Sequence, residues 1–226
     1  ALPIWPGPLS LVLPLRPDAG LTPAVTAGLP TVALRVPAHP LTQAVLHELG
    51  LPLAAPSANR STQISPTTPD HVTRSLGNGV AAILDGGACA QGLESTIVAL
   101  RDTGQWSLLR EGPLTSAILA EVLGCPPTDL AKGIEAPGQM LRHYAPGKPV
   151  RLDSAKAEAG EFMIGFGSVA GDCSLSPAGD LAQAAARLYA CLHEAAASGC
   201  ARIAVAPIPQ AGIGAAINDR LRRAAG

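Results

Sequence analysis

A dense row of small side chains, many of them polar, follows an apolar run near residue 54. The row consists of Ala54, Ala55, Pro56, Ser57, Ala58, Asn59, Arg60 and Ser61, followed by Ile64, Ser65, Pro66, Thr67, Thr68 and Pro69. Small side chains let a ligand approach the backbone, while Ser57, Asn59 and Ser65 supply donors and acceptors that neither a helix nor a sheet requires. The row predicts a pocket for a polar small molecule. A surface loop rich in turn-forming residues is the alternative.

Glycines combined with hydroxyl side chains form a second candidate anion site. Asp85-Gly86-Gly87 ends one apolar run, and Gly92-Leu93-Glu94-Ser95-Thr96 leads into the next. Glycines at strand ends leave backbone N–H groups able to point at an anion, and Ser95 and Thr96 add hydroxyl donors. Phosphate or carboxylate oxygens would fit such a site. A tight turn with no ligand remains the alternative.

An arginine stands at the end of a third apolar run. Arg110 follows the run 106–109 and comes just before an expected turn at Gly112 and Pro113. A guanidinium at this position could bind a phosphate through two parallel hydrogen bonds. An ion-paired or solvated arginine is the other interpretation.

Taken together, these segments resemble the YrdC-like threonylcarbamoyl-AMP synthase family. The stretches that carry the resemblance are Ile4–Ser10, Thr31–Pro37, Ala55–Asn59, Ser65–Thr68, Asp85–Gly87, Gly92–Thr96 and Arg110–Gly112. Residues 136–146 resemble the linker of the longer, two-domain members, and residues 203–207 and 214–221 resemble their small C-terminal domain. The resemblance therefore spans essentially the whole chain.

The resemblance implies a reaction between L-threonine, bicarbonate and ATP that yields threonylcarbamoyl-adenylate and pyrophosphate. The intermediate would pass to a downstream tRNA-modifying transferase complex for threonylcarbamoyladenosine formation. This chemistry needs no protein nucleophile, so we assign no catalytic residue and expect the protein to position reactants and stabilise charge. Mg²⁺ would neutralise the triphosphate, and we assign it no protein ligands.

Matching the motifs residue by residue gives two sets of implied contacts. Arg35, Ser57 and Ser95 would bind the threonine carboxylate and its neighbouring groups. The residues facing the nucleotide would be Thr31, the backbone of Ala55, Asn59, Ser65, Arg110 and, from the linker, Tyr144.

Family members begin with a segment that contains a Thr-Glu-Thr-x-Tyr-Gly-Leu motif and a Lys-Gly-Arg-Pro motif, and neither motif occurs in this sequence. We therefore expect the chain to lack that segment. Two other functions stay open on these grounds. One is an inactive fragment or a nucleotide- or RNA-binding module of the same fold, and the other is a carbamoyltransferase that works through carbamoyl-adenylate.

Composition limits the class of protein. The chain has 226 residues, 47% of them hydrophobic, which is enough for one large domain or two modest ones. A formal net charge of −1 argues against tight direct binding of tRNA. Prolines, glycines and charges interrupt every apolar run before it reaches the roughly 20 residues of a membrane span. Five widely spaced cysteines, without a zinc-type pair, favour a reducing cytoplasm.

The alternation of apolar runs and helical stretches predicts an α/β protein. We expect a twisted mixed-sheet catalytic domain of YrdC type over residues 1–124, a linker or lid over 125–150, and a small Rossmann-like α/β domain over 151–226. Expected strands are 10–14, 31–36, 53–55, 81–85, 96–100, 106–110, 161–166 and 202–206. Expected helices are 40–49, 68–76, 115–123, 180–197 and one from about residue 214. The C-terminal domain is expected to have a regulatory role, to hold the lid in place or to mediate oligomerisation.

Overall fold

The computed structural model describes residues 3–101, 103–129, 135 and 143–226. The chain packs as two compact units, and each unit combines two stretches of sequence. The first unit contains residues 1–54 and 94–140, and the second contains residues 55–93 and 141–226.

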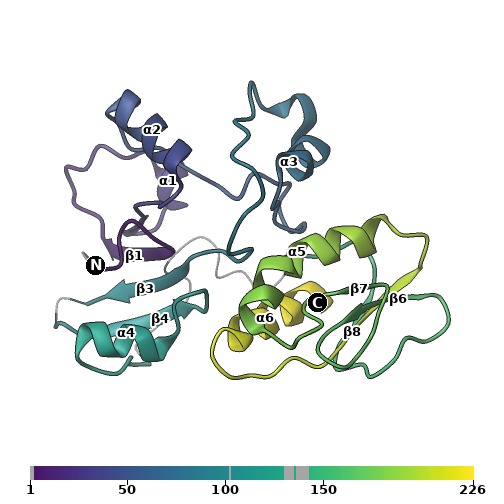
Figure 1. The fold of residues 1–226 in the computed structure, drawn as a ribbon. Helices are drawn as coiled ribbons and strands as arrows, with labels where there is room; N and C mark the ends of the chain where they lie inside the picture. The colour runs from purple at the N-terminus through teal and green to yellow at the C-terminus, as the bar shows by residue number, and fades with distance from the viewer. Residues whose placement is uncertain (1–2, 102, 130–134, 136–142) are drawn as a thin grey trace. The chain divides into compact units, whose positions relative to one another are not determined.

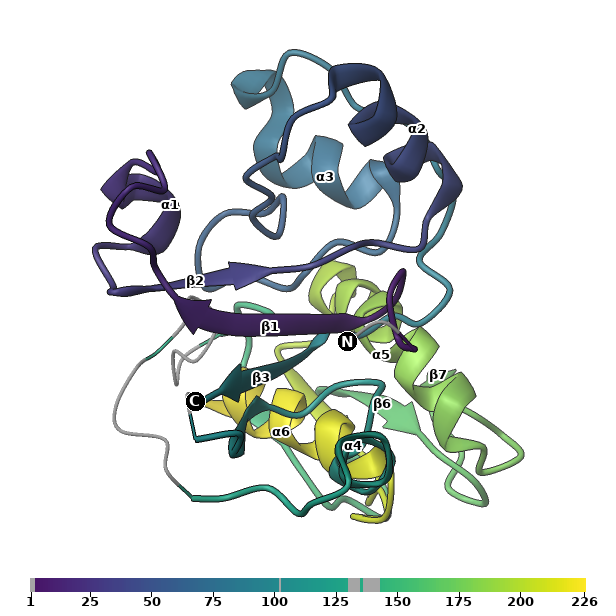
Figure 2. The same ribbon diagram turned by 90° about the vertical axis from the view of Figure 1, so that its left-hand side faces the viewer.

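A mixed four-stranded sheet forms the centre of the first unit. Its strands are β1 (Leu9–Pro14), β2 (Thr31–Leu34), β3 (Thr96–Leu100) and β4 (Trp106–Arg110), in the spatial order β2-β1-β3-β4 (Figures 1 and 2). β1 and β3 run parallel, whereas β1–β2 and β3–β4 are antiparallel pairs. This arrangement confirms the expected mixed sheet.

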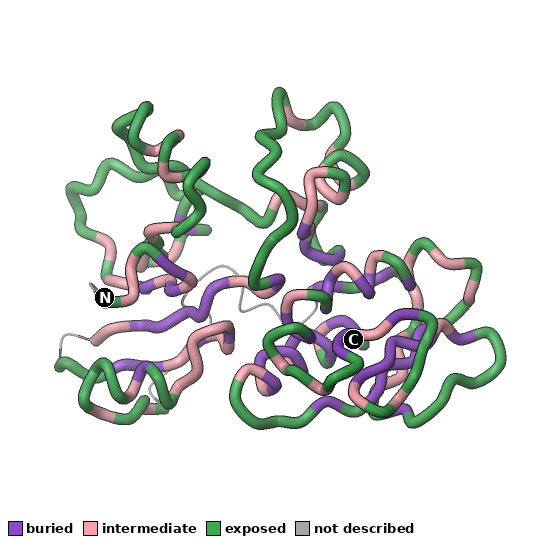
Figure 3. The backbone as a smooth tube through the Cα atoms, viewed as in Figure 1, coloured by how far each residue is buried: buried purple, intermediate pink, exposed green. Residues whose placement is uncertain are grey.

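The two faces of this sheet have separate apolar clusters. Leu9, Leu11, Val98 and Trp106 pack with Leu119 of helix α4 (Ser116–Leu123). The other face carries the cluster Val12, Ile97, Ala99 and Leu109. β3 is the most deeply buried strand of this sheet, since four of its five residues are buried and apolar clusters cover both of its faces (Figure 3).

Local signals set the helix ends in this unit. Thr115 caps α4, since its side chain accepts a hydrogen bond from the Ile118 N–H, and the helix ends at Gly124 in the left-handed conformation. The helices α1 (Pro23–Thr26) and α2 (Pro40–Leu49) begin with proline. α2 forms where predicted, yet none of its residues is buried and Leu49 remains 50% exposed.

The second unit contains an all-parallel sheet. Its strands are β5 (Val150–Arg151), β6 (Glu161–Gly165), β7 (Cys173–Ser174) and β8 (Arg202–Val205), in the order β5-β8-β6-β7. The helices α5 (Leu181–Ala197) and α6 (Gly214–Ala225) pack with it (Figure 1). The apolar side of α5, which includes Leu188 and Leu192, lies in the core. The small open α/β architecture is confirmed.

Residues 55–93 belong to this second unit. They contain α3 (Pro69–Leu76), capped by the Thr68 side chain, and the short 3₁₀ turn Gly77–Gly79. Ile64 lies in the core cluster with α5. Gly92 is buried so close to α5 that a Cβ there would lie 2.4 Å from the Ala185 carbonyl oxygen. The packing therefore groups these residues differently from a division of the sequence near residue 124.

Two expected strands are wrong. Residues 53–55 and 81–85 join no ladder of the described chain, and their apolar side chains Leu53 and Leu84 are 51% and 63% exposed (Figure 3). An apolar run becomes a strand only where another strand supplies its backbone hydrogen bonds. Neither run has such a neighbour among the described residues. The expected strand 31–36 is also shorter and ends at Leu34.

Within the described residues, no helix has both the length and the apolar character needed to cross a bilayer.

An ion pair joins the ends of two strands in the second unit. The Glu161 carboxylate accepts hydrogen bonds from Arg151 Nε at 3.0 Å, Arg151 Nη2 at 2.6 Å and the Glu158 N–H at 2.7 Å. Hydrogen bonding by Arg151, followed by the Glu158 amide, lowers the pKa of the Glu161 carboxyl to about 2. The folded protein therefore strongly prefers the ionised carboxylate.

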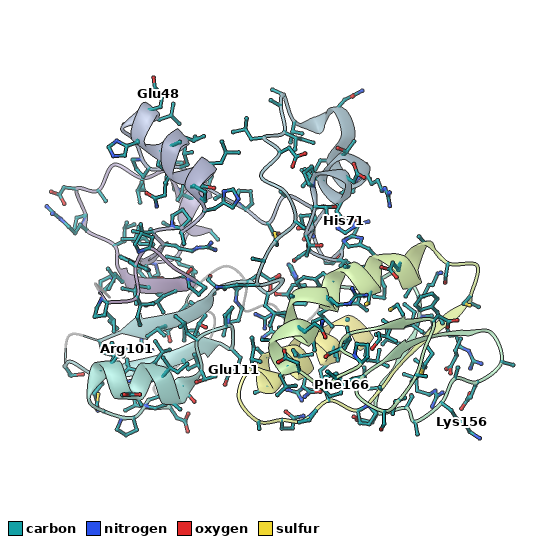
Figure 4. The ribbon with its side chains drawn as sticks, viewed as in Figure 1. Glu48, His71, Arg101, Glu111, Lys156 and Phe166 are labelled. Atoms are coloured by element: carbon teal, nitrogen blue, oxygen red, sulfur yellow. The ribbon has the colours of Figure 1, made fainter. Side chains whose placement is uncertain are left out.

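We expect Glu161→Gln to destabilise the protein at pH 7, with the difference from wild type shrinking as the pH falls toward about 2. A carboxyl whose pKa is lowered by folding stabilises the native state above its unfolded pKa of about 4.3, and this contribution disappears as the pH approaches the folded pKa. Urea unfolding at several pH values between about 7 and 2 measures the effect. The control is Glu48→Gln on α2, an exposed carboxyl (Figure 4). A constant difference at every pH would contradict the prediction.

Candidate functional site

Three of the polar residues of the first unit meet at one end of its sheet. Arg110, the last residue of β4, donates through Nη2 to the Ser95 carbonyl at 2.9 Å and to Ser95 Oγ at 3.3 Å, and through Nε to the same carbonyl at 3.2 Å. Ser95 Oγ lies 2.7 Å from Ser10 Oγ on β1. The structure thus brings together Ser95 and Arg110, which belong to different sequence motifs. Ser10 joins them. We call these three residues the Ser10–Ser95–Arg110 cluster.

A β-bulge directs Arg110 into this cluster. Ile97 pairs with Arg110 while Val98 pairs with Leu108, so Leu109 is an extra residue in β4. Strict alternation would have placed Arg110 on the same face as Trp106, the face covered by α4. The extra residue instead pairs Arg110 with Ile97, which lies on the opposite face with Leu109.

The chain beyond Arg110 is tied to Thr96, next to Ser95. Thr96 Oγ1 donates to the Leu114 carbonyl at 2.8 Å and lies 3.0 Å from the Leu114 N–H, which donates to it. Gly112 packs against Thr96 so tightly that a Cβ would lie 2.5 Å from the Thr96 nitrogen. Glycine is therefore required at this position for the approach of the two segments.

Arg35 and Thr31 lie at opposite ends of β2. Leu34 pairs with Leu11, so the next residue, Arg35, lies at the end of the sheet that carries Ser10. Thr31 pairs with Pro14, the far end of β1. At about 3.3 Å per residue, the two backbone positions are roughly 13 Å apart. Arg35 therefore shares an end with the Ser10–Ser95–Arg110 cluster, and the structure does not bring Thr31 to it.

Thr31 lines a separate cavity of about 320 Å³ at its own end of the sheet. Its Oγ1 donates to the Glu135 carbonyl at 2.7 Å. Glu135 forms an ion pair with Arg101, whose Nη2 donates to Glu135 Oε1 at 2.8 Å, and hydrogen bonding by Glu135 raises the pKa of the Arg101 guanidinium (Figure 4). This end of the sheet thus contains its own paired charges.

The second unit contains the remaining predicted site residues. Ala55 and Ser57 are exposed. Asn59 Nδ2 donates to the Gln63 carbonyl at 2.9 Å, while the buried Oδ1 of Asn59 has no hydrogen-bond partner among the described residues. Ser65 is buried, and its carbonyl accepts a hydrogen bond from His193. Asn59 and Ser65 are thus fixed within a single unit.

Tyr144, the predicted linker contact, is packed in the core of the second unit. Its ring is 1% exposed, lies 5.3 Å from the Tyr189 ring centroid and has the Arg220 guanidinium 5.5 Å above it. Arg220 is itself fully buried and forms an ion pair with Asp219 at 2.5 Å. The backbone of Tyr144 is left-handed, with φ of 67°. Its contact with the nucleotide stays a prediction, and residues 136–142 of the expected linker lie outside the described residues.

Two contributing residues were missed by the sequence reasoning. The role of Ser10 has a weak signal, since it is a hydroxyl among the apolar residues 9–13 of β1. For His193 the sequence gives no signal, because nothing near it in the sequence links this helix to residue 65. Its partner Ser65 lies 128 positions earlier.

We expect Gly112→Ala to lower the free energy of unfolding by about 1–3 kcal/mol, the usual cost of forcing an extra carbon into a packed site. The added Cβ would displace Thr96 or the chain at Leu114. Thermal or urea unfolding measures the change. Gly199→Ala is the matched control, because a Cβ at Gly199 meets nothing within 4 Å. Equal stability of the two variants would show that the close approach is not required.

Two family models match consecutive parts of the chain. The model of the Sua5, YciO and YrdC family, described as telomere recombination, matches residues 2–112. The model described as the threonylcarbamoyl-AMP synthase C-terminal domain matches residues 114–226.

Curated relatives and a solved structure agree with these models. Threonylcarbamoyl-AMP synthase of Bacillus subtilis is 37% identical over 98% of this chain and 70% of the relative, and that of Pyrococcus abyssi is 34% identical over 98% and 71%. The crystal structure of P. abyssi Sua5 complexed with L-threonine matches with a TM-score of 0.87 and 31% identity, covering 100% of this chain and 72% of that one. The chain therefore belongs to the threonylcarbamoyl-AMP synthase family and has its two-domain YrdC/Sua5 fold.

Proposed function

We propose that this chain is an L-threonylcarbamoyladenylate synthase, a nucleotidyltransferase that makes threonylcarbamoyl-AMP for tRNA threonylcarbamoyladenosine formation. The observation that carries the proposal is the Ser10–Ser95–Arg110 cluster. In this cluster Arg110, proposed for nucleotide binding, donates hydrogen bonds of 2.9 and 3.3 Å to Ser95, proposed for threonine binding. The cluster occurs in a chain that matches threonylcarbamoyl-AMP synthases over 98% of its length.

The reaction joins three substrates in two steps. The threonine amine attacks the carbon of bicarbonate, and loss of water leaves a carbamate. A carbamate oxygen then attacks the α-phosphorus of ATP, the bond from that phosphorus to the bridging oxygen breaks, and pyrophosphate leaves. No covalent bond to the protein is needed, so the side chains act by orienting the reactants and by stabilising charge on carboxylate and phosphate.

The first unit supplies the residues proposed to meet threonine and phosphate. Arg35 suits the threonine carboxylate, because a guanidinium binds a carboxylate with two parallel hydrogen bonds. The threonine complex of P. abyssi Sua5 supports this choice of ligand. Arg110 lies beside Ser95, so a phosphate on Arg110 would be next to the threonine group on Ser95. Thr31 remains a predicted nucleotide contact apart from this cluster.

The second unit contains the other predicted contacts. Ser57 is proposed to bind threonine, and the remaining predicted residues of this unit are proposed to contact the nucleotide. Asn59 is proposed as a nucleotide contact because its amide group can both donate to and accept from a ligand group such as a ribose hydroxyl. Ser65, the Ala55 backbone and Tyr144 complete the proposed set.

Mg²⁺ is proposed to arrive with ATP. The described residues contain no group of three or more histidine, cysteine, aspartate or glutamate side chains able to hold a metal ion. Magnesium usually keeps several waters and binds through substrate phosphates, which fits a nucleotide-borne ion. We further propose a cytoplasmic enzyme that passes its product to a tRNA-modifying transferase complex, without tight tRNA binding of its own.

We expect pyrophosphate release by the purified chain to require threonine, bicarbonate and ATP together. Omitting any one substrate should reduce release to background, because the carbamate must form before it attacks the phosphate. A coupled pyrophosphate assay with mass detection of threonylcarbamoyl-AMP measures this. Release that persists without threonine would contradict the proposal, because it would show attack on the α-phosphorus of ATP by water or another nucleophile in place of the threonine carbamate.

We expect Arg35→Ala to raise the threonine requirement about tenfold or more while the ATP requirement changes about twofold or less, as for loss of a charged contact to one substrate. Apparent KM values from pyrophosphate release, and the threonine Kd from calorimetry, measure the two effects separately. Arg16→Ala is the control, since Arg16 is an exposed arginine paired only with nearby Asp18 in the described contacts. Equal changes for threonine and ATP would overturn the assignment of Arg35.

A further inference from the structure

A histidine of the C-terminal part of the chain fixes the backbone of a proposed nucleotide contact. His193 lies on α5, and its Nε2 is 3.2 Å from the Ser65 carbonyl oxygen. A carbonyl oxygen only accepts, so Nε2 must carry the hydrogen and donate it. The place of Ser65 is therefore set by a residue 128 positions later in the sequence.

A second histidine and a backbone amide hold the same loop. His71 of α3 (labelled in Figure 4) stacks on His193, with ring centroids 3.7 Å apart and an angle of 25° between the rings. The Thr67 N–H donates to His71 Nδ1 at 3.3 Å, and the Thr67 carbonyl accepts from the Cys89 N–H at 2.9 Å. Backbone atoms of Ser65 and Thr67 are thus bound at three points, and both side chains are buried.

The surroundings favour the neutral form of both rings. Burial lowers the pKa of His193 to about 4, with His71 and Arg74 acting in the same direction and the Ser65 carbonyl opposing them. Burial and Arg74 also lower the pKa of His71, against the effect of Asp70. A proton on His71 Nδ1 would remove the acceptor for the Thr67 N–H, and a cation on either ring would face the other ring and Arg74.

We propose that His193 is a positioning residue for the reaction: its Nε2–H fixes Ser65, and its stack with His71 fixes Thr67, so that the loop 65–67 is presented to the nucleotide in one conformation. The C-terminal domain thereby contributes to the nucleotide site without touching the nucleotide. This inference rests on the proposed function, because the place of Ser65 affects the reaction only if the loop binds ATP.

Two substitutions separate the hydrogen bond from the packing. His193→Phe keeps an aromatic ring against His71 but removes the donor to Ser65, whereas His193→Gln keeps an N–H donor on a side chain of similar reach. His47→Phe is the matched control, because His47 is an exposed histidine in the last turn of α2. All variants are compared in the full chain.

For His193→Phe we expect the apparent KM for ATP to rise about tenfold, with the KM for threonine changed about twofold or less, and His193→Gln to recover most of the loss. A second measurement needs no turnover. Hydrogen–deuterium exchange at the Thr67 and Cys89 amides should become about tenfold faster in His193→Phe and stay unchanged in His47→Phe.

The pH dependence of hydrogen exchange at the Thr67 amide is a further test, because a histidine that only filled space would not make this exchange depend on its protonation. A histidine whose pKa is lowered by folding supports the loop above its unfolded pKa of about 6.5, and this support declines as the pH falls toward about 4. After correction for intrinsic exchange rates, Thr67 in wild type should therefore lose protection over this range. The loss should be smaller in His193→Phe.

The outcomes distinguish the inference from the proposed function. If wild type shows no ATP-dependent pyrophosphate release, the proposed function fails, and the exchange at Thr67 and Cys89 alone decides whether His193 fixes the loop. If exchange at these amides is the same in wild type and His193→Phe, the inference is overturned. It is also overturned if the KM values for ATP and threonine rise together in proportion to a loss of thermal stability.

Discussion

The pairing of β3 with β1 on one side and β4 on the other is the constraint on which the first unit depends. The strand is buried on both faces, so its register with each neighbour is set by side-chain packing as well as by backbone hydrogen bonds. That register decides which polar residues stand at each end of the sheet. Ser95 precedes β3 and is hydrogen-bonded to Arg110, whereas Arg101 follows β3 and is paired with Glu135.

One irregularity in this sheet has a chemical consequence. A β4 strand without the extra residue at Leu109 would direct Arg110 under α4, where a guanidinium would have to be buried among apolar side chains. Burying an unpaired charge in this way is costly. The bulge avoids the cost and turns the same arginine toward Ser95, which accepts its hydrogen bonds. Gly112 then lets the chain return close beside Thr96.

In the second unit, α5 has a comparable organising role. One side of the helix packs on the parallel sheet, while residues 55–93 are attached to it by Ile64, by Gly92 and by the His71–His193 stack. The part of the sequence with the densest small polar residues therefore owes its conformation to a helix of the C-terminal domain. A helix of the C-terminal domain can in this way fix the conformation of a distant loop.

Elements were predicted correctly where a local pattern and a tertiary partner coincide. β3 and β4 are apolar runs and α5 has an apolar side, and each of them packs in a core. Residues 53–55 and 81–85 have apolar runs of the same kind, but a strand needs a second strand beside it, and no described residue supplies one. α2 shows the intermediate case, because a helix satisfies its own backbone and can form although its apolar side chains remain exposed.

The sequence by itself indicated the family and its reaction through the resemblance of its motifs, and it supplied the residues proposed for the site, because small hydroxyl, glycine and arginine residues in fixed order are a local pattern. Only the tertiary structure decided that Ser10 joins Ser95 and Arg110, that Thr31 lies at the other end of the sheet, and that His193 binds Ser65. The physical reason is that strand register, a one-residue bulge and a hydrogen bond across 128 positions all depend on which surfaces pack together. No short stretch of sequence contains that information.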